Sequence, residues 1–226
     1  MSNPFDLTGR RALVTGANTG IGQAIAVGLA QAGADVICAG RRACDETLSR
    51  ITDAGGTASS VLVDFADPMA GQGLFDGQSI DILVNNAGIQ HVAKIEDFPV
   101  DKWDAVLAIN LSSAFHAMRL ALPAMKAANW GRIINVSSAH GLVGSAEKSA
   151  YVAAKHGLIG LTKVAALETA TSGVTCNAIC PGWVLTPLVQ KQVDARAAAQ
   201  NISNEEAKRQ LLGEKEPSMQ FTTPEE

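Results

Sequence analysis

The stretch RALVTGANTGIGQAIAVGLAQAGADVICA, residues 11–39, decides the fold of this chain. It begins with an apolar run that predicts a strand, continues with apolar residues at helical spacing up to Gly33, and ends in a second apolar run. Gly16, Gly20 and Gly22 lie between the first strand and the helix, where the absence of a Cβ lets the backbone turn tightly. The alternative is a turn that binds nothing. The order of strand, glycine turn, helix and strand favours a βαβ unit whose helix N-terminus holds a diphosphate.

The residues after the second predicted strand indicate which dinucleotide would bind. An acidic residue at this place would hydrogen-bond the ribose hydroxyls of NAD, but the chain has Gly40, Arg41 and Arg42. An arginine can hold the 2′-phosphate of NADP instead. The alternative is that both arginines are ordinary surface residues. We therefore expect NAD or NADP as the cofactor, with Arg41 favouring NADP.

The rest of the chain continues the alternation of strands and helices. Further strands are expected over residues 59–63, 80–84, 131–137 and 174–179, and helices over 44–54, 100–108, 111–128 and 149–170. Residues 66–79 are rich in glycine and leave room for only a brief crossover helix. The pattern predicts the α/β class: a Rossmann-type, doubly wound parallel sheet with helices on both faces, formed as a single domain. Such sheets bind ligands outside the carboxyl ends of their strands.

Composition narrows the class of protein. The 226 residues suffice for one large core, and 47% hydrophobic with 18% charged residues suits a buried sheet. A net charge of −4 gives no basic surface, so we expect no nucleic-acid partner. The four cysteines form no Cys-x-x-Cys pair, so we expect no metal site. The N-terminus has no apolar signal core and no apolar run approaches membrane-spanning length, so we expect no membrane contact and a cytoplasmic protein.

Residues 137–155, SSAHGLVGSAEKSAYVAAK, carry the candidate chemistry. Tyr151 and Lys155 are four positions apart, which places them one turn apart on one face of the predicted helix. An ammonium favours the phenolate, so a tyrosine beside a lysine can act as a base near neutral pH. Ser138 follows the preceding strand and lies at the same edge of the sheet. The alternative is a tyrosine and a lysine without function on an ordinary helix.

Other polar residues stand at strand ends or inside apolar segments. Asp64 follows the third predicted strand, where it can accept a hydrogen bond from an adenine amino group or cap the next turn. Asn85 and Asn86 follow the fourth strand and can tie neighbouring strands together. Asn110 lies between two predicted helices and needs a partner, which is either backbone or a water molecule.

Taken in order, these motifs resemble the short-chain dehydrogenase/reductase family, and the resemblance covers nearly the whole chain. The motifs are TGANTGIG at 15–22, Asp64, NNAG at 85–88, Asn110, Ser138, YVAAK at 151–155, and PGW at 181–183 with Thr186. The resemblance implies an NAD(P)-dependent enzyme acting on CH–OH donors. It implies that Tyr151 is the acid/base and that Lys155 lowers the tyrosine pKa and binds the nicotinamide ribose. Ser138 would orient the substrate oxygen, and Asn110 would hold a water.

The resemblance also implies the residues that contact the cofactor. They come from the glycine turn, the strand ends, the catalytic helix and the PGW segment: Gly16, Asn18, Thr19, Gly20, Ile21, Gly22, Arg41, Asp64, Phe65, Asn86, Ala87, Gly88, Tyr151, Lys155, Pro181, Gly182, Val184 and Thr186.

Residues 88–192 are similar to bacterial D-3-hydroxybutyrate dehydrogenases, a group within this family, through GIQHV, SSAHGLVGSAEKSAY and PGWVLTPLVQKQV. The resemblance implies a small carboxylate substrate and interconversion of D-3-hydroxybutyrate and acetoacetate. One cation, an imidazole and two amides suit such a carboxylate. The implied substrate contacts, each of which is alternatively a plain surface residue or pocket wall, are Gln90, Ser138, His140, Lys148, Tyr151, Trp183 and Gln192.

Residues 1–88 are more similar to 2-deoxy-D-gluconate 3-dehydrogenases, as in a natural intermediate between two groups or a chimera. A sugar-acid keto reductase is therefore the alternative activity. Members of the family usually continue past the last residues of this sequence with a further helix, strand and apolar tail. That difference leaves a weakly active cofactor-binding scaffold as a third hypothesis.

The resemblance also suggests how the chain is organised. We expect residues 1–88 to bind mainly the cofactor, residues 89–212 to hold the catalytic and substrate-binding side chains, and residues 213–226 to be a poorly ordered tail. The resemblance implies a homo-oligomer, a dimer formed through the long helices at 111–128 and 149–170 or a tetramer.

Overall fold

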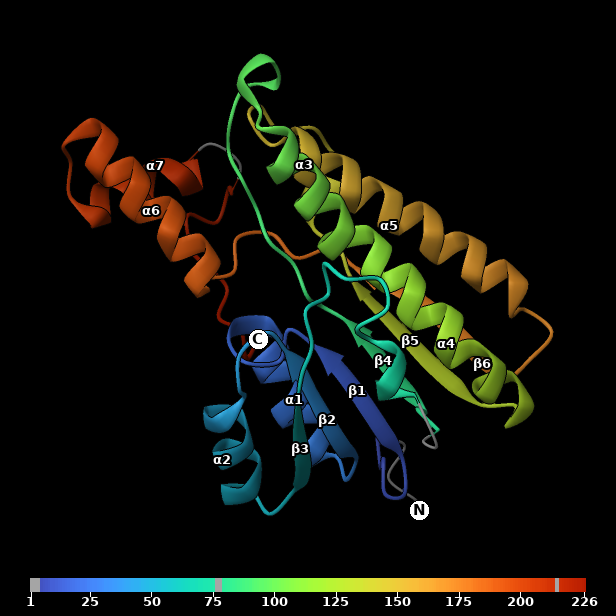
Figure 1. The fold of residues 1–226 in the computed structure, drawn as a ribbon. Helices are drawn as coiled ribbons and strands as arrows, with labels where there is room; N and C mark the ends of the chain where they lie inside the picture. Colours follow the sequence, from blue (N-terminus) through green and yellow to red (C-terminus); the bar gives the residue numbers. More distant parts are fainter. Residues whose placement is uncertain (1–4, 76–78, 214–215) are drawn as a thin grey trace.

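The computed structural model describes residues 5–75, 79–213 and 216–226. One parallel sheet has the strand order β3-β2-β1-β4-β5-β6 (Figure 1). Its strands are β1 (Arg11–Thr15), β2 (Asp35–Gly40), β3 (Thr57–Leu62), β4 (Ile82–Asn85), β5 (Gly131–Val136) and β6 (Val174–Ile179). Strand β1 pairs with both β2 and β4, so the chain changes direction across the sheet between them. The predicted doubly wound sheet is confirmed, and its switch point lies at the carboxyl ends of β1 and β4.

Helices cover both faces of the sheet, as Figure 1 shows. On one face lie α1 (Gly20–Gln31) and α2 (Asp45–Asp53), and on the other lie α3 (Val100–Leu107), α4 (Ser113–Ala127) and α5 (Ser149–Glu168). Successive residues of a strand point to opposite faces. Leu13 of β1 therefore packs with Met118 of α4, whereas Ala12 and Val14 pack with Ala26 of α1. Because both faces are covered, the strands read as continuous apolar runs in the sequence.

Helices α3 and α4 form one continuous helical stretch rather than the two separate helices that were predicted. A π-helical turn, η3 (Ala108–Ser112), joins them and contains Asn110. The whole stretch, Val100–Ala127, is long and apolar enough to span a membrane by length and composition. That finding corrects the expectation that no apolar run reaches this length. Its residues Ala117 and Ala121 are buried against the sheet, which is typical of a core helix in a globular protein.

Two further helices, α6 (Pro187–Gln200) and α7 (Asn204–Gly213), stand beyond the carboxyl ends of the strands (Figure 1). They pack on each other through Val193, Ala197, Ala207 and Leu211. Neither helix was predicted from the sequence.

The crossover after β3 contains a short 3₁₀ turn, η1 (Gln72–Leu74), in place of a full helix.

The last residues of the chain lie against the segment that leads into α6. Thr222 forms an isolated parallel bridge with Val184. The Thr222 amide donates to the Trp183 carbonyl oxygen, and the Leu185 amide donates to the Thr222 carbonyl oxygen, each at 3.0 Å. The Phe221 ring meets the Trp183 ring edge-on, with centroids 6.3 Å apart. Of the predicted tail, residues 214 and 215 lie outside the described residues.

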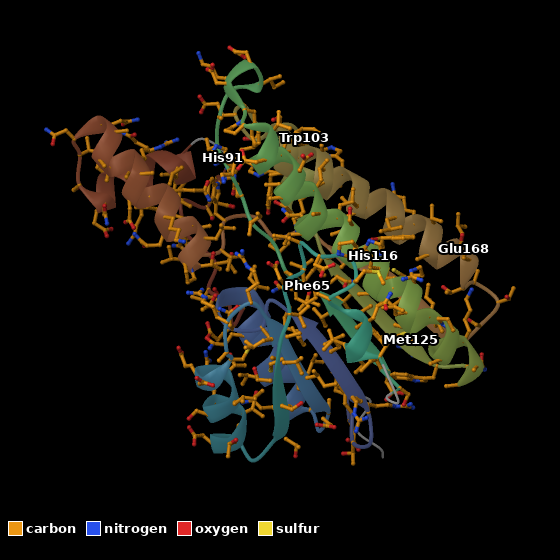
Figure 2. The ribbon with its side chains drawn as sticks, viewed as in Figure 1. Phe65, His91, Trp103, His116, Met125 and Glu168 are labelled. Atoms are coloured by element: carbon orange, nitrogen blue, oxygen red, sulfur yellow. The ribbon has the colours of Figure 1, made fainter. Side chains whose placement is uncertain are left out.

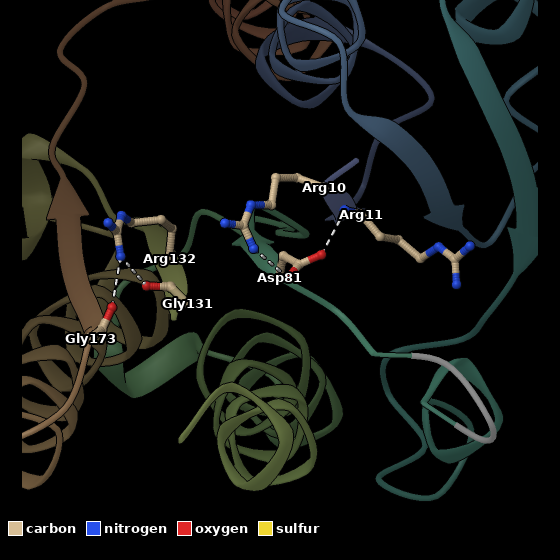
Figure 3. A network of polar contacts seen from close by, with 6 residues as sticks. All are labelled: Arg10, Arg11, Asp81, Gly131, Arg132 and Gly173. Atoms are coloured by element: carbon tan, nitrogen blue, oxygen red, sulfur yellow. Dashed lines mark hydrogen bonds and ion pairs between the residues drawn. The ribbon is translucent and has the colours of Figure 1, made fainter. Parts of the chain in front are cut away.

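A polar network holds the amino ends of the strands together (Figure 3). The Asp81 carboxylate accepts from the Arg10 guanidinium at 3.3 Å and from the Arg11 amide at 2.9 Å. Beside it, the Arg132 guanidinium donates to the Gly173 carbonyl oxygen at 2.9 Å. Because these contacts lie at the opposite end of the strands from the switch point, they stabilise the sheet without touching the site described next.

Candidate active site

A cavity of about 350 Å³ lies at the carboxyl ends of the strands, between the sheet and the first turn of α6. The structure brings most of the predicted cofactor and catalytic residues to its walls. These are Gly16, Asn18, Thr19, Gly20, Ile21, Gly22, Arg41, Phe65, Asn86, Ala87, Gly88, Ser138, Tyr151, Lys155, Pro181, Gly182, Val184 and Thr186.

The cavity wall also contains residues that sequence reasoning missed. They are Gly40, Arg42, Ile89, Ile109, Val136, Ser137, Pro187, Leu188, Val189 and Lys191. Several are direct neighbours of predicted residues in β2, β4 and β5. The last four belong to α6, and the signal that would have found them is Thr186 followed by Pro187, a helix-start pattern.

The glycine turn after β1 is shaped to receive a bulky anionic group. Gly16 has a φ of +67°, which favours glycine. A Cβ on Gly22 would lie 2.3 Å from both the Gly16 carbonyl oxygen and the Asn86 amide nitrogen, so the backbone here can be approached only because the side chain is absent. The N-cap residue of α1, Thr19, makes no side-chain cap bond, which leaves the first amides of the helix available to an anion.

The charges around the cavity fit the same kind of group. Among the described lining residues there is no carboxylate, while the cations are Arg41, Arg42, Lys155 and Lys191. The chain as a whole has a net charge of −4, so this cationic cavity is a local feature. The glycine turn and the cations together fit the phosphates of a dinucleotide.

Asparagines at the end of β4 tie neighbouring strands together, as predicted. The Asn85 amide donates to the Asn135 side-chain oxygen at 2.8 Å, and both residues are buried. The Asn86 amide donates to the Thr15 carbonyl oxygen at 3.0 Å. These bonds fix β4 against β1 and β5, at the place where the predicted ligand site lies.

The predicted Tyr-Lys pair stands on the first two turns of α5, facing the cavity. The Lys155 ammonium lies 5.6 Å from the centre of the Tyr151 ring and donates to the Val136 carbonyl oxygen at 2.7 Å. The Ser138 side chain makes a hydrogen bond with Tyr151. Ser138, Tyr151 and Lys155 thus form one connected group between β5 and α5.

Burial shifts both titratable members of this group. It raises the pKa of Tyr151, because a phenolate is poorly solvated here, and the hydrogen bond from Ser138 acts in the lowering direction. Burial also lowers the pKa of Lys155 to about 8, with Cys180 acting in the raising direction. The sequence led us to expect a lowered tyrosine pKa. In the structure desolvation outweighs the effects that favour the phenolate.

Asn110 has its side chain bound to backbone and not to the cavity. Its oxygen accepts from the Ile89 amide at 2.8 Å, and its amide donates to the Ile89 carbonyl oxygen at 2.9 Å. Asn110 is 2% exposed, and the π-helical turn aims it at the loop after β4. Of the two partners considered from the sequence, the side chain has backbone. It positions Ile89, which does line the cavity.

Asp64 is a predicted cofactor contact that the structure does not place on the cavity wall. Its side chain is exposed and accepts from the Ala66 amide at 3.0 Å. This geometry favours the turn-capping alternative. The next residue, Phe65, lines the cavity instead.

Three predicted substrate residues meet one another although they come from distant parts of the chain, but neither they nor Gln90 and His140 are among the residues that line the large cavity. The Lys148 ammonium donates to the Gln192 side-chain oxygen at 3.1 Å and lies 5.2 Å from the centre of the Trp183 ring. The residue before Lys148, Glu147, has a φ of +63°, and its carbonyl oxygen accepts from the Ala93 amide at 2.9 Å. This left-handed residue and its bridge hold Lys148 at the start of α5.

Of the other two predicted substrate residues, Gln90 and His140, only His140 is in contact with the Tyr-Lys pair. The His140 ring meets the Tyr151 ring edge-on at 6.3 Å between centroids, and the His140 amide donates to the Ser138 hydroxyl at 3.1 Å. The Gln90 amide nitrogen is buried and has no partner among the described residues. A buried donor of this kind calls for an acceptor outside the described residues.

A second, smaller cavity of about 20 Å³ lies behind Phe65, which lines both cavities. Its wall includes His116 of α4, and both residues are labelled in Figure 2. The Nδ1 atom of His116 is buried without a partner among the described residues. The space is sufficient for one water molecule.

Comparisons with known proteins identify the family of the chain. The family profile described as short chain dehydrogenase matches residues 10–197. The D-beta-hydroxybutyrate dehydrogenase of Cupriavidus necator is 59% identical, over 97% of this chain and 88% of that protein. The same-named protein of Rhizobium meliloti is 50% identical, over 96% of this chain and 88% of that protein.

Solved structures show the same fold. A crystal structure assigned as a 2-deoxy-D-gluconate 3-dehydrogenase from Agrobacterium tumefaciens, with NADP bound, is 44% identical. It has a TM-score of 0.87 and the match covers 99% of this chain and 87% of that one. With the family profile, the identities and the geometry in agreement, the chain belongs to the short-chain dehydrogenase family.

Proposed function

We propose that this chain is an NAD(P)-dependent oxidoreductase that interconverts D-3-hydroxybutyrate and acetoacetate. The observation that carries the proposal is the contact of Lys148, which stands at the N-cap of α5 three residues before Tyr151, with Gln192 and Trp183. A proton-transfer group and a carboxylate-binding group then flank one small substrate. The names of the relatives from Cupriavidus necator and Rhizobium meliloti point to the same reaction.

The proposed chemistry assigns one proton and one hydride to separate partners. Tyr151 gives a proton to the substrate oxygen in reduction, and its phenolate takes the hydroxyl proton in oxidation, for which the charge of Lys155 has to offset the effect of burial on the tyrosine pKa. Ser138 donates a hydrogen bond to the substrate oxygen as its charge changes. Lys155 supplies a positive charge near the tyrosine ring and binds the nicotinamide ribose. When bound, the nicotinamide supplies or accepts the hydride. Asn110 positions Ile89, and its predicted role in holding a water stays a prediction.

The proposed recognition of the carboxylate uses one cationic donor and two amide donors. The Lys148 ammonium provides the charge, and Gln192 and Gln90 provide amide donors. Because the buried Gln90 amide nitrogen lacks a partner among the described residues, a substrate oxygen would satisfy it. His140 adds an imidazole next to Ser138 and Tyr151. A short acid fits this set better than a long apolar chain does.

For the cofactor, we propose that Arg41 and Arg42 at the end of β2 hold the ribose 2′-phosphate of NADP. Both line the cavity, where no acidic residue competes for the ribose hydroxyls. The Agrobacterium tumefaciens structure with the same fold is one with NADP bound. Dissociation constants for NAD and NADP, measured for the wild type and Arg41→Ala, test the preference. A wild type that favours NAD would reject it.

A sugar-acid keto reductase is the alternative activity, favoured by the 44% identity to the structure assigned as a 2-deoxy-D-gluconate 3-dehydrogenase. Absorbance of the reduced nicotinamide separates the hypotheses when D-3-hydroxybutyrate and a deoxy sugar acid are offered in turn with each dinucleotide. We expect turnover of D-3-hydroxybutyrate. Turnover of the sugar acid alone would favour the alternative, and dinucleotide binding without turnover of either would leave the scaffold.

We further propose the organisation and the assembly of the chain. Residues 1–88 bind mainly the cofactor, residues 89–212 hold the catalytic and substrate-binding residues, and residues 213–226 form a tail.

A homo-oligomer would form through α4 and α5, because Phe115, Val164 and Leu167 are exposed apolar side chains on these helices. The four cysteines are free thiols, which suits a reducing cytoplasm. Size-exclusion chromatography with light scattering tests the assembly.

A further inference from the structure

Two adjacent faces of helix α6 make different contacts. One face lines the large cavity, and the other contacts the proposed substrate residue Lys148. Pro187 and Lys191 are one helical turn apart and both line the large cavity. Gln192, on the adjacent face, accepts a hydrogen bond from Lys148 in the substrate region. The helix is therefore placed to contact two ligands at once, and only the face with Gln192 has a proposed role so far.

The face with Pro187 and Lys191 lies over the start of α1. A Cβ on Gly20, the first residue of α1, would lie 3.1 Å from the Thr186 side chain and 3.8 Å from the Pro187 ring. The first turn of α6 thus sits on the N-terminus of α1. That N-terminus, with its glycine turn, is where the phosphates of the proposed cofactor belong.

Lys191 brings a positive charge that no carboxylate among the described residues pairs with. Its side chain is exposed, and the ion pairs among the described residues do not include it. The described residues that share the cavity with Lys191 include no carboxylate. A phosphate bound at the start of α1 is the group that would pair with its ammonium.

We propose that Lys191 is a cofactor-binding residue that contacts the diphosphate of NAD(P). This proposal rests on the proposed function. It gives Lys191 a different task from Arg41 and Arg42, which stand at the end of β2 and meet the 2′-phosphate. Cofactor binding on one face of α6, and the Lys148–Gln192 contact on the other, then hold the same helix over the site.

Direct binding measurements on the full chain test the assignment. Dissociation constants for NAD and for NADP are measured by calorimetry for the wild type, Lys191→Gln and Lys191→Arg. The matched control is Lys126→Gln, which removes an exposed charge of the same kind from the last turn of α4. Circular dichroism and thermal unfolding show that each variant is folded.

We expect Lys191→Gln to weaken both dinucleotides by the same factor, about 3- to 10-fold, as for one partly exposed charge contact. Both dinucleotides contain the diphosphate, so the ratio of their dissociation constants should stay constant. Lys191→Arg should bind as the wild type does, and Lys126→Gln should have no effect. High salt should shrink the difference between Lys191→Gln and the wild type, because it screens an exposed charge.

Three outcomes would overturn the assignment. They are unchanged binding in Lys191→Gln, a loss confined to NADP, which would move Lys191 to the 2′-phosphate, and an equal loss in Lys126→Gln. If the wild type binds a dinucleotide but oxidises no 3-hydroxy acid, the proposed reaction is rejected. The role of Lys191 is then still decided by the dissociation constants for NAD and NADP. A wild type that binds neither dinucleotide would reject both.

Discussion

The Lys155 ammonium donates a 2.7 Å hydrogen bond to the carbonyl oxygen of Val136, the last residue of β5. The bond fastens the catalytic helix to the strand that delivers Ser138. Lys155 is 4% exposed, so this carbonyl oxygen replaces part of the hydration that the ammonium loses. The cost of that lost hydration appears as the lowered pKa of Lys155.

This lowered pKa predicts how stability depends on pH. Folding lowers the pKa of Lys155 from 10.5 to about 8, so between these values the unfolded chain binds more protons than the folded chain. The contribution of Lys155 to the free energy of unfolding therefore rises with pH across this window. We expect the wild type to gain about 2 kcal/mol relative to Lys155→Met between pH 7 and pH 9.5. Urea unfolding of both proteins at a series of pH values measures it, and parallel pH profiles would contradict it.

Replacing the proposed base should separate chemistry from binding. Tyr151→Phe keeps the ring that packs near His140 and removes only the hydroxyl that exchanges a proton. We expect kcat to fall by about 10²- to 10⁴-fold, as for loss of a general base. The dissociation constant for the dinucleotide should stay within a factor of about two, because the glycine turn is untouched. Stopped-flow kinetics and calorimetry measure the two quantities. A variant with near-normal kcat would reject the assignment.

Lys148 should govern the affinity for the carboxylate and not the rate of hydride transfer. Lys148→Met removes the ammonium that donates to Gln192 and keeps an apolar chain beside Trp183. We expect KM for D-3-hydroxybutyrate to rise by about 10- to 100-fold, the range for a hydrogen bond to a charged group. The methyl ester of the same substrate, which carries no charge, serves as the control and should lose little. An equal rise in KM for acid and ester would show that Lys148 does not recognise the charge.

Two glycines of α1 should respond to alanine in opposite ways. Gly22→Ala places a methyl group 2.3 Å from the Gly16 carbonyl oxygen, so we expect a loss of about 1–3 kcal/mol in stability and loss of dinucleotide binding. Gly28 is on the same helix and has no atom within 4 Å of a built Cβ. Gly28→Ala should therefore stabilise the chain by about 0.4–1 kcal/mol and leave binding unchanged. Thermal unfolding and calorimetry on both variants check the pair, and equal behaviour would contradict it.

Asp81 should matter for stability alone. Asp81→Ala leaves the Arg11 amide and the Arg10 guanidinium without this acceptor at the amino ends of the strands. We expect a loss of about 1–2 kcal/mol in the free energy of unfolding, with KM for substrate and cofactor unchanged. Asp101→Ala, which breaks an exposed ion pair with Lys102, is the control and should have no measurable effect on stability. A change in KM for Asp81→Ala would show that the network reaches the site.

The sheet could be predicted from the sequence because its signals are local. Each strand is a short apolar run, and the glycine turn joins a strand to a helix as the βαβ unit requires. The strand β6 is found over the residues that were predicted, 174–179, and the other strands agree within two residues. The break predicted at Asn110 was wrong, because one extra residue per turn in a π-helix absorbs a polar side chain without ending the helix.

Helices α6 and α7 were harder to predict than the sheet. Helix α6 has a narrow stripe of buried side chains, Val189, Val193 and Ala197. This stripe is covered mostly by α7 and Trp183. The helical spacing of apolar residues in α6 is therefore too weak to predict the helix from the sequence alone. For the same reason, the contact between Lys148 and Gln192 could be expected only from the resemblance to a known group. Local patterns contain no information about which two distant segments will pack together.

The Thr186 side chain packs against Gly20 although most of the chain separates the two residues in sequence. During synthesis the glycine turn leaves the ribosome early, whereas α6 follows only after β6. Contacts between such distant residues form late in folding, because a long loop must close first. A nascent chain therefore contains the glycine turn before α6 is in place. Tight dinucleotide binding would mark the molecules that have finished folding.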